Sequence, residues 1–113
     1  MNVFKNEETG VTLHVEIADS AFKRLMGLMG RRRLESGHGL FIAPCDGIHM
    51  CFMRFSIDAV YVDKDYRIKK IVRNLRPWLG LSMCFGAFGV LELPSGDADK
   101  FDLKVGQMFS STI

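Results

Sequence analysis

The chain has 113 residues, of which 48% are hydrophobic and 25% charged, and its formal net charge is +2. This length fits one domain, and the composition is typical of a chain that buries a core rather than of a disordered one. The small net charge does not favour nucleic acid or a membrane surface as partner, and no apolar run approaches the roughly 20 residues that span a bilayer. Because the first residues lack a signal-peptide pattern, the sequence predicts a single cytoplasmic domain over residues 1–113.

Strands are predicted along most of the chain, and the clearest covers residues 11–17. Apolar and polar residues alternate there with period two, which is typical of a strand with one buried face. Further strands are predicted at 3–4, 40–42, 59–62, 67–72, 90–93 and 105–109. A hairpin turn is predicted at 63–66, and one helical turn is predicted at 97–101 with Ser95 as its cap.

One principal helix is predicted near the N-terminus, where Asp19 or Ser20 could cap it. From Phe22 to Met29 apolar side chains recur at spacings of three and four residues, which indicates a helix with one buried face. Gly30 suits the position just beyond such a helix. The elements together predict an α+β fold, a strand-rich, curled, barrel-like sheet with this helix packed across it.

Short motifs occur in a fixed order between residues 11 and 109. They include Gly39-Leu40-Phe41-Ile42, His49-Met50-Cys51-Phe52-Met53-Arg54-Phe55-Ser56-Ile57-Asp58, Leu91-Glu92-Leu93-Pro94-Ser95-Gly96 and Val105-Gly106-Gln107. The ordered set resembles the bacterial and archaeal family named domain of unknown function 192. The resemblance implies a small α+β domain rich in strands, and it implies no particular activity. The chain departs from the family pattern at Ser95, where relatives often have alanine, and at Gln107, where they often have aspartate.

The stretch from Cys45 to Asp58 holds the most informative polar residues. Residues 48–55 are predicted to be extended, and in an extended chain His49, Cys51 and Met53 would share one face. We interpret this stretch as the floor of a mostly apolar ligand pocket with a few polar groups. The candidate ligand-binding residues are His49, Met53, Arg54, Asp58 and Trp78. The alternative is a core strand whose polar side chains are satisfied by hydrogen bonds.

The cysteines give a second and weaker candidate site. Three thiols and one imidazole could bind zinc, and neighbouring methionines would suit Cu(I). The weak metal candidates are Cys45, His49, Cys51 and Cys84. Their spacing is not that of a zinc motif, and buried cysteines are the commoner interpretation, so no metal or cofactor is predicted.

The sequence contains no catalytic motif of the common kinds, such as a Gly-rich phosphate loop, His-Glu-x-x-His or a nucleophile elbow. It therefore favours a non-enzymatic binding or accessory module whose partner is a small molecule or a protein segment. The alternative is a thiol- or metal-dependent activity centred on Cys45, His49, Cys51 and Cys84. The oligomeric state is not predicted.

Overall fold

The computed structural model describes residues 2–18, 20, 28, 31–50 and 52–112, and strands dominate this part of the chain. The strands are β1 (Asn2–Asn6), β2 (Thr12–Ala18), β3 (His38–Ile42), β4 (Gly47–His49), β5 (Ile57–Val62), β6 (Ile68–Leu75), β7 (Leu81–Met83), β8 (Gly89–Pro94) and β9 (Phe109–Ser111). Within the described residues there is one helix, α2 (Asp97–Lys100). None of the helical structure in this part is long and apolar enough to cross a membrane.

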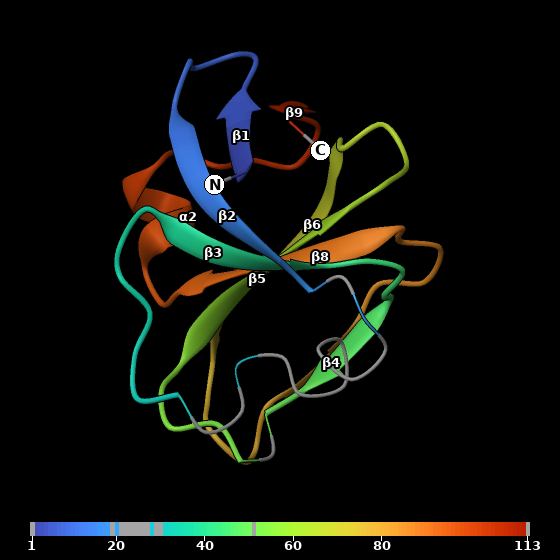
Figure 1. Cartoon of the computed structure of the whole chain (residues 1–113). Coiled ribbons are helices and arrows are strands. Elements are labelled where there is room, and N and C mark those ends of the chain that lie inside the picture. Colours follow the sequence, from blue (N-terminus) through green and yellow to red (C-terminus); the bar gives the residue numbers. More distant parts are fainter. Residues whose placement is uncertain (1, 19, 21–27, 29–30, 51, 113) are drawn as a thin grey trace.

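Seven strands form one curled sheet in the order β6-β5-β8-β3-β2-β1-β9, whereas β4 and β7 form a separate two-stranded ribbon. Neighbouring strands of the sheet are antiparallel, except for β2 and β3, which are parallel. The two edges of the sheet meet through backbone hydrogen bonds. The Ile68 N–H donates to the Gln107 carbonyl over 2.7 Å, and the Phe109 N–H donates to the Tyr66 carbonyl over 2.9 Å. Figure 1 shows the curled sheet with β4 set apart from it.

The strands bury apolar side chains on both faces of the sheet, which gives two cores. The first core contains Phe4, whose ring centroid lies 5.1 Å from that of Phe41 and 5.4 Å from that of Phe109. The second core lies against the opposite face and contains Tyr61 and Val90. Because side chains alternate along a strand, consecutive residues of β8 serve different cores, and this explains its almost continuous burial.

The predicted α+β class, with a principal helix near the N-terminus, is wrong. Strands dominate the described residues, and the helix among them is α2, near the C-terminus. Residues 19, 21–27 and 29–30 of the predicted helix lie outside the described residues. In the described chain the ribbon contributes Ile48 to the second core, and Leu28 from the predicted helical segment lies in the same core.

The turn predicted at 63–66 is confirmed, whereas the cap of the predicted helical turn and the start of the last predicted strand are shifted along the chain. The turn at 63–66 forms because the Asp63 carboxylate accepts hydrogen bonds from the N–H groups of Asp65 and Arg67, over 2.8 and 3.0 Å. The predicted helical turn is α2, but the residue at its N-cap is Gly96 rather than Ser95, and that residue supplies no side-chain cap. The last strand is β9, which begins four residues later than predicted.

Candidate functional site

The stretch expected to run extended from residue 48 to 55 does not do so. The strand β4 ends at His49, and a turn follows in which the Met53 N–H donates to the Met50 carbonyl over 3.1 Å. Phe52 has a φ of 63°, in the left-handed region. Period-two alternation therefore stops at this turn: His49 and Arg54 are exposed, and Met53 is buried in the second core. Cys51 lies outside the described residues.

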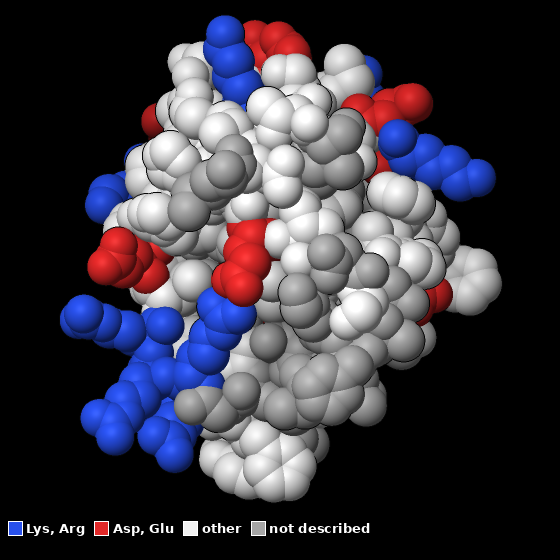
Figure 2. Space-filling model, in the orientation of Figure 1, with Lys and Arg blue, Asp and Glu red and all other residues white. Residues whose placement is uncertain are grey.

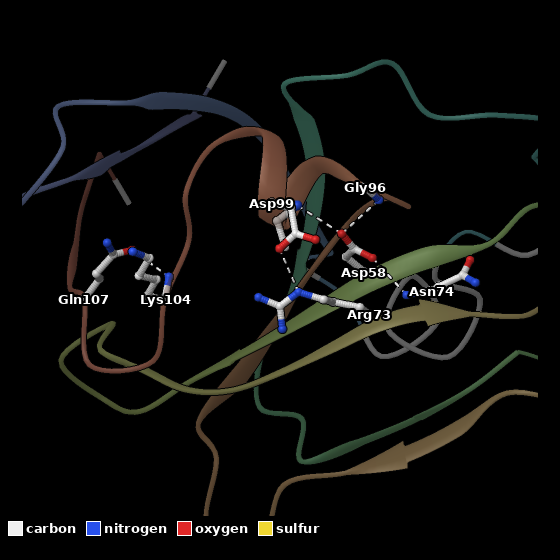
Figure 3. A network of polar contacts seen from close by, with 8 residues as sticks. Asp58, Arg73, Asn74, Gly96, Asp99, Lys104 and Gln107 are labelled. Carbon is white, nitrogen blue, oxygen red and sulfur yellow. Dashed lines mark hydrogen bonds and ion pairs between the residues drawn. The ribbon is translucent and has the colours of Figure 1, made fainter.

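Asp58 is buried on β5 and is engaged by backbone amides. Its carboxylate accepts hydrogen bonds from the N–H of Asn74 over 2.9 Å and from those of Gly96 and Ala98 over 3.0 Å each. Figure 3 shows Asp58 between the start of α2 and the β6 backbone, with the exposed Arg73–Asp99 ion pair nearby. The carboxylate thus does the capping that was predicted for Ser95.

The predicted site residues therefore divide between the two faces of the sheet. Asp58 and Val60 share one face of β5, and the residues on either side of Asp58 point to the second core. Met53 lies in that second core. His49 and Trp78 belong to the ribbon region, since His49 pairs with Leu81 and the Trp78 N–H donates to the Met50 carbonyl over 2.7 Å.

Trp78 belongs to an exposed apolar surface that the sequence interpretation underestimated. Its ring centroid lies 4.8 Å from that of Phe52. Leu81 and Met83 point outward from β7, whereas Ser82 between them points inward. We call this set the β7 surface; its members are Phe52, Trp78, Leu79, Leu81, Met83 and Phe85, with exposed fractions from 58% to 93%. The alternation of β7 could have indicated it, because Leu81, Met83 and Phe85 are spaced by two.

The ribbon is fastened to the sheet by polar contacts as well as by packing. The hydroxyls of Tyr61 and Ser82 are 2.6 Å apart, and burial raises the pKa of Tyr61 to about 12. The Lys70 ammonium donates to the Met83 carbonyl over 2.7 Å. The outward face of β7 is thus presented by an anchored strand and not by a free loop.

Two of the three cysteines can be placed. Cys84 is buried in the second core, and Cys45 packs against the same core while its thiol donates to the Gly47 carbonyl over 3.2 Å. Burial raises the pKa of the Cys45 thiol, which disfavours the thiolate that metals and electrophiles require. Among the described residues no group of three or more His, Cys, Asp or Glu side chains could hold a metal ion.

Glu92 is a candidate functional residue that the sequence interpretation missed. It is 4% exposed, and in the described structure its Oε1 atom has no hydrogen-bond partner. Burial raises the pKa of Glu92 to about 7, and the Arg31 guanidinium lowers it by a smaller amount. The signal in the sequence was a single glutamate inside the apolar run from Val90 to Leu93. A buried carboxyl group with such a pKa is typical of functional sites.

Arg31 belongs to a basic cluster on the surface. Figure 2 shows Lys and Arg side chains gathered at the lower left of one face, beside an acidic side chain recessed in the surface. In Figure 1 the segment that leads into β3, which contains Arg31, Arg32 and Arg33, lies in this part of the molecule. Arg31 donates two hydrogen bonds to the Glu16 carboxylate, over 2.8 and 2.9 Å.

A curled sheet with a two-stranded ribbon packed on its second core places this chain in a class of small β-rich domains. Residues 3–111 match the DUF192 family, described as an uncharacterized ACR, and the chain belongs to this family. The UPF0127 protein of Thermococcus sibiricus is 34% identical over 100 residues, which are 84% of this chain and 64% of that protein. The UPF0127 protein of Pyrococcus horikoshii is 36% identical over 69 residues, 57% of either chain. The chain thus spans less than two thirds of the length of these relatives.

Two solved structures have the same fold. One, from Sinorhizobium meliloti, belongs to a protein named as a candidate transcription regulator; it has a TM-score of 0.85 and 23% identity, covering 97% of this chain and 91% of that one. The other is a protein of unknown function from Novosphingobium aromaticivorans, with a TM-score of 0.84 and 23% identity, covering 96% and 82%. At this identity the likeness shows the fold alone.

Proposed function

We propose that this domain is a binding module that takes up an extended segment of another protein along β7, and that this segment carries apolar and acidic side chains. The observation that carries the proposal is the β7 surface, a set of six large apolar side chains that are all at least 58% exposed. A contiguous exposed apolar patch is a common mark of an interaction site. The proposal uses Trp78 and the neighbourhood of His49, and it leaves out Asp58, whose carboxylate is engaged by three amides.

The backbone of β7 supports strand addition as the mode of binding. Hydrogen bonds from the Met50 N–H to the Gly80 carbonyl and from the Cys84 N–H to the Asp46 carbonyl show which residues face β4. In an antiparallel pair the residues between them direct their backbone groups away, so Leu81 and Met83 face the other edge. That edge pairs with none of the strands that the structure describes. On this edge an added strand would find the backbone N–H and carbonyl of Leu81, the N–H of Met83 and the apolar side chains of both residues, while the Met83 carbonyl already accepts a hydrogen bond from the Lys70 ammonium.

The charges around the β7 surface favour an acidic partner. Lys70 reaches the Met83 carbonyl, and the exposed side chains of Lys69, Arg54 and Arg76 lie close to the surface in sequence or structure. A second copy of this chain would bring these cations against one another, which is unfavourable. A segment with acidic side chains between its apolar ones matches both features.

A designed peptide tests the proposal directly. The probe is a ten-residue peptide in which glutamate alternates with valine and phenylalanine, and the observable is the amide NMR spectrum of the labelled domain. We expect the largest shifts between Leu81 and Phe85. The double variant Leu81→Ser/Phe85→Ser should weaken binding at least about tenfold, because buried aromatic and aliphatic anchors carry most interface energy. Val105→Ser, which removes a 63% exposed apolar side chain outside the β7 surface, is the control.

Three results would overturn the proposal. A peptide with lysine in place of glutamate that binds as tightly would remove the acidic partner. Binding to vesicles of anionic phospholipid, without binding to the peptide, would assign the β7 surface to membranes. Concentration-dependent association that Leu81→Ser abolishes would assign it to a second copy of this chain.

A further inference from the structure

We infer that Glu92 is the anionic anchor of a separate interior site, which takes a small ligand with a cationic nitrogen and an apolar body. This site lies in the second core, on the sheet, and not on the β7 surface. It goes beyond strand addition at β7, and neither proposal depends on the other. The inference starts from one buried oxygen atom, Glu92 Oε1, for which the described structure provides no hydrogen-bond partner. Native structures seldom leave such an atom unpaired.

The strand register shows what surrounds Glu92. A row of side chains crosses four strands on this face, because Glu16 pairs with Leu40, Leu40 with Glu92, and Glu92 with Ala59. The two direct neighbours of Glu92 in this row are therefore apolar. Tyr61 lies two residues beyond Ala59 on the same face of β5. The Glu92 carboxyl group is therefore flanked by the apolar side chains of Leu40 and Ala59.

The Arg31 guanidinium lies near Glu92 but forms its ion pair with the Glu16 carboxylate. The Arg31 guanidinium is close enough to lower the pKa of Glu92, yet its two hydrogen bonds of 2.8 and 2.9 Å go to Glu16. Glu16 stands two strands away in the same row, and its ion pair with Arg31 is partly exposed, with side-chain exposures of 56% and 40%. Among the described residues, Glu92 Oε1 therefore receives no hydrogen bond, and the Arg31 charge acts on Glu92 only from a distance.

The other charged and titratable groups near Glu92 decide what kind of ligand fits. The Tyr61 hydroxyl and the Cys45 thiol both have pKa values that burial and the Glu92 charge raise, so both stay neutral. His38, on the same face of β3, lies 3.8 Å from Glu35. An anionic ligand would face repulsion from an ionised Glu92, and a metal would lack ligands, because the described residues offer no group of three. A single ammonium group on an apolar body suits one carboxylate between apolar neighbours.

The experiment follows the carboxyl carbon of Glu92 by NMR, in protein labelled at glutamate, while methylamine, butylamine or benzylamine is added. Benzylamine should shift the Glu92 signal and lower the pH at which it titrates. Since the ammonium pairs with the ionised carboxylate, binding should weaken about tenfold for each pH unit below the Glu92 pKa. Glu92→Gln, which keeps shape and removes the charge, should reduce benzylamine binding at least about tenfold. Glu8→Gln, at an exposed position, is the matched control.

Clear results would overturn the inference. One is benzyl alcohol binding at the same place as tightly as benzylamine, which would make the site merely apolar. Another is undiminished amine binding by Glu92→Gln, and a third is the failure of all three amines to move the Glu92 signal. Because the probes and variants differ from those for β7, either proposal can fail while the other stands.

Discussion

The protonation of one buried side chain, Glu92, affects the stability of the whole domain. A glutamate in the unfolded chain ionises near pH 4.5, whereas burial raises the pKa of Glu92 in the folded chain to about 7. Between these values the folded state holds a proton that the unfolded state has lost. Stability contributed by the protonated form is therefore complete below pH 4.5 and declines as pH rises toward 7.

This linkage predicts a measurable pH dependence. The free energy of unfolding of the unchanged protein should fall between pH 4.5 and pH 7 by up to about 3 kcal/mol, beyond whatever the other groups contribute. Glu92→Gln should remove that fall, and Glu8→Gln, whose side chain is exposed, should retain it. Urea denaturation at several pH values measures the difference. Parallel curves for the unchanged protein and Glu92→Gln would show that Glu92 does not carry the effect.

At the scale of elements, Asp58 joins its own strand β5 to two segments that are distant in sequence, β6 and the start of α2. Its carboxylate binds the β6 backbone at Asn74, the turn at Gly96 and the first turn of α2 at Ala98. A short helix without a side-chain cap of its own depends on such a partner. The fixed position of α2 on the sheet is thus set from β5.

Replacing Asp58 by alanine should therefore be costly. Up to three amides would lose a charged acceptor, and we expect the free energy of unfolding to fall by about 3 kcal/mol or more. Asp99→Ala removes another aspartate of the same region, but its ion pair with Arg73 is exposed, so that change should cost less than about 1 kcal/mol. Equal effects of the two substitutions, measured by urea denaturation, would contradict the capping role.

The accuracy of the sequence predictions follows the physics of each element. Period-two alternation located β2 well, and turn chemistry at Asp63 located the hairpin, because both signals are local. The prediction of an extended chain after His49 was wrong. The apolar residues there form a turn instead, and this turn buries both Met50 and Met53 in the second core. Tertiary packing outweighs local preference there.

The candidate site was harder to predict than the fold. The sequence pointed to Asp58 and Trp78, but it could not show that they lie in different parts of the molecule. Their positions depend on how the strands pair, and the residue spacing within one strand does not determine that pairing. Glu92 is buried because Leu40 and Ala59 flank it from strands far away in sequence. A glutamate inside an apolar strand can be noticed in a sequence, but its missing partner cannot.

For the whole molecule, closure of the sheet depends on the last strand. Phe109 is 3% exposed, packs on Phe4 and bonds to the Tyr66 carbonyl, so one residue joins the first core to both edges of the sheet. Phe109→Ala should lower the free energy of unfolding by about 3–5 kcal/mol. Val105→Ala, at a 63% exposed position nearby, should change it by less than about 0.5 kcal/mol. Thermal and urea denaturation measure both, and a small effect of Phe109→Ala would show that the sheet closes without it.

The pairing of β1 with β9 has a consequence for architecture. Phe4 and Ser111 are directly opposite each other, so the points where the chain enters and leaves the fold are separated by only about 5 Å. Figure 1 shows both ends at the side of the molecule away from β4. A domain with this arrangement can be inserted into a surface loop of a host protein with little distortion of the host. In such an insertion the ribbon that carries the β7 surface would lie on the side of the domain away from the host, where a partner could reach it.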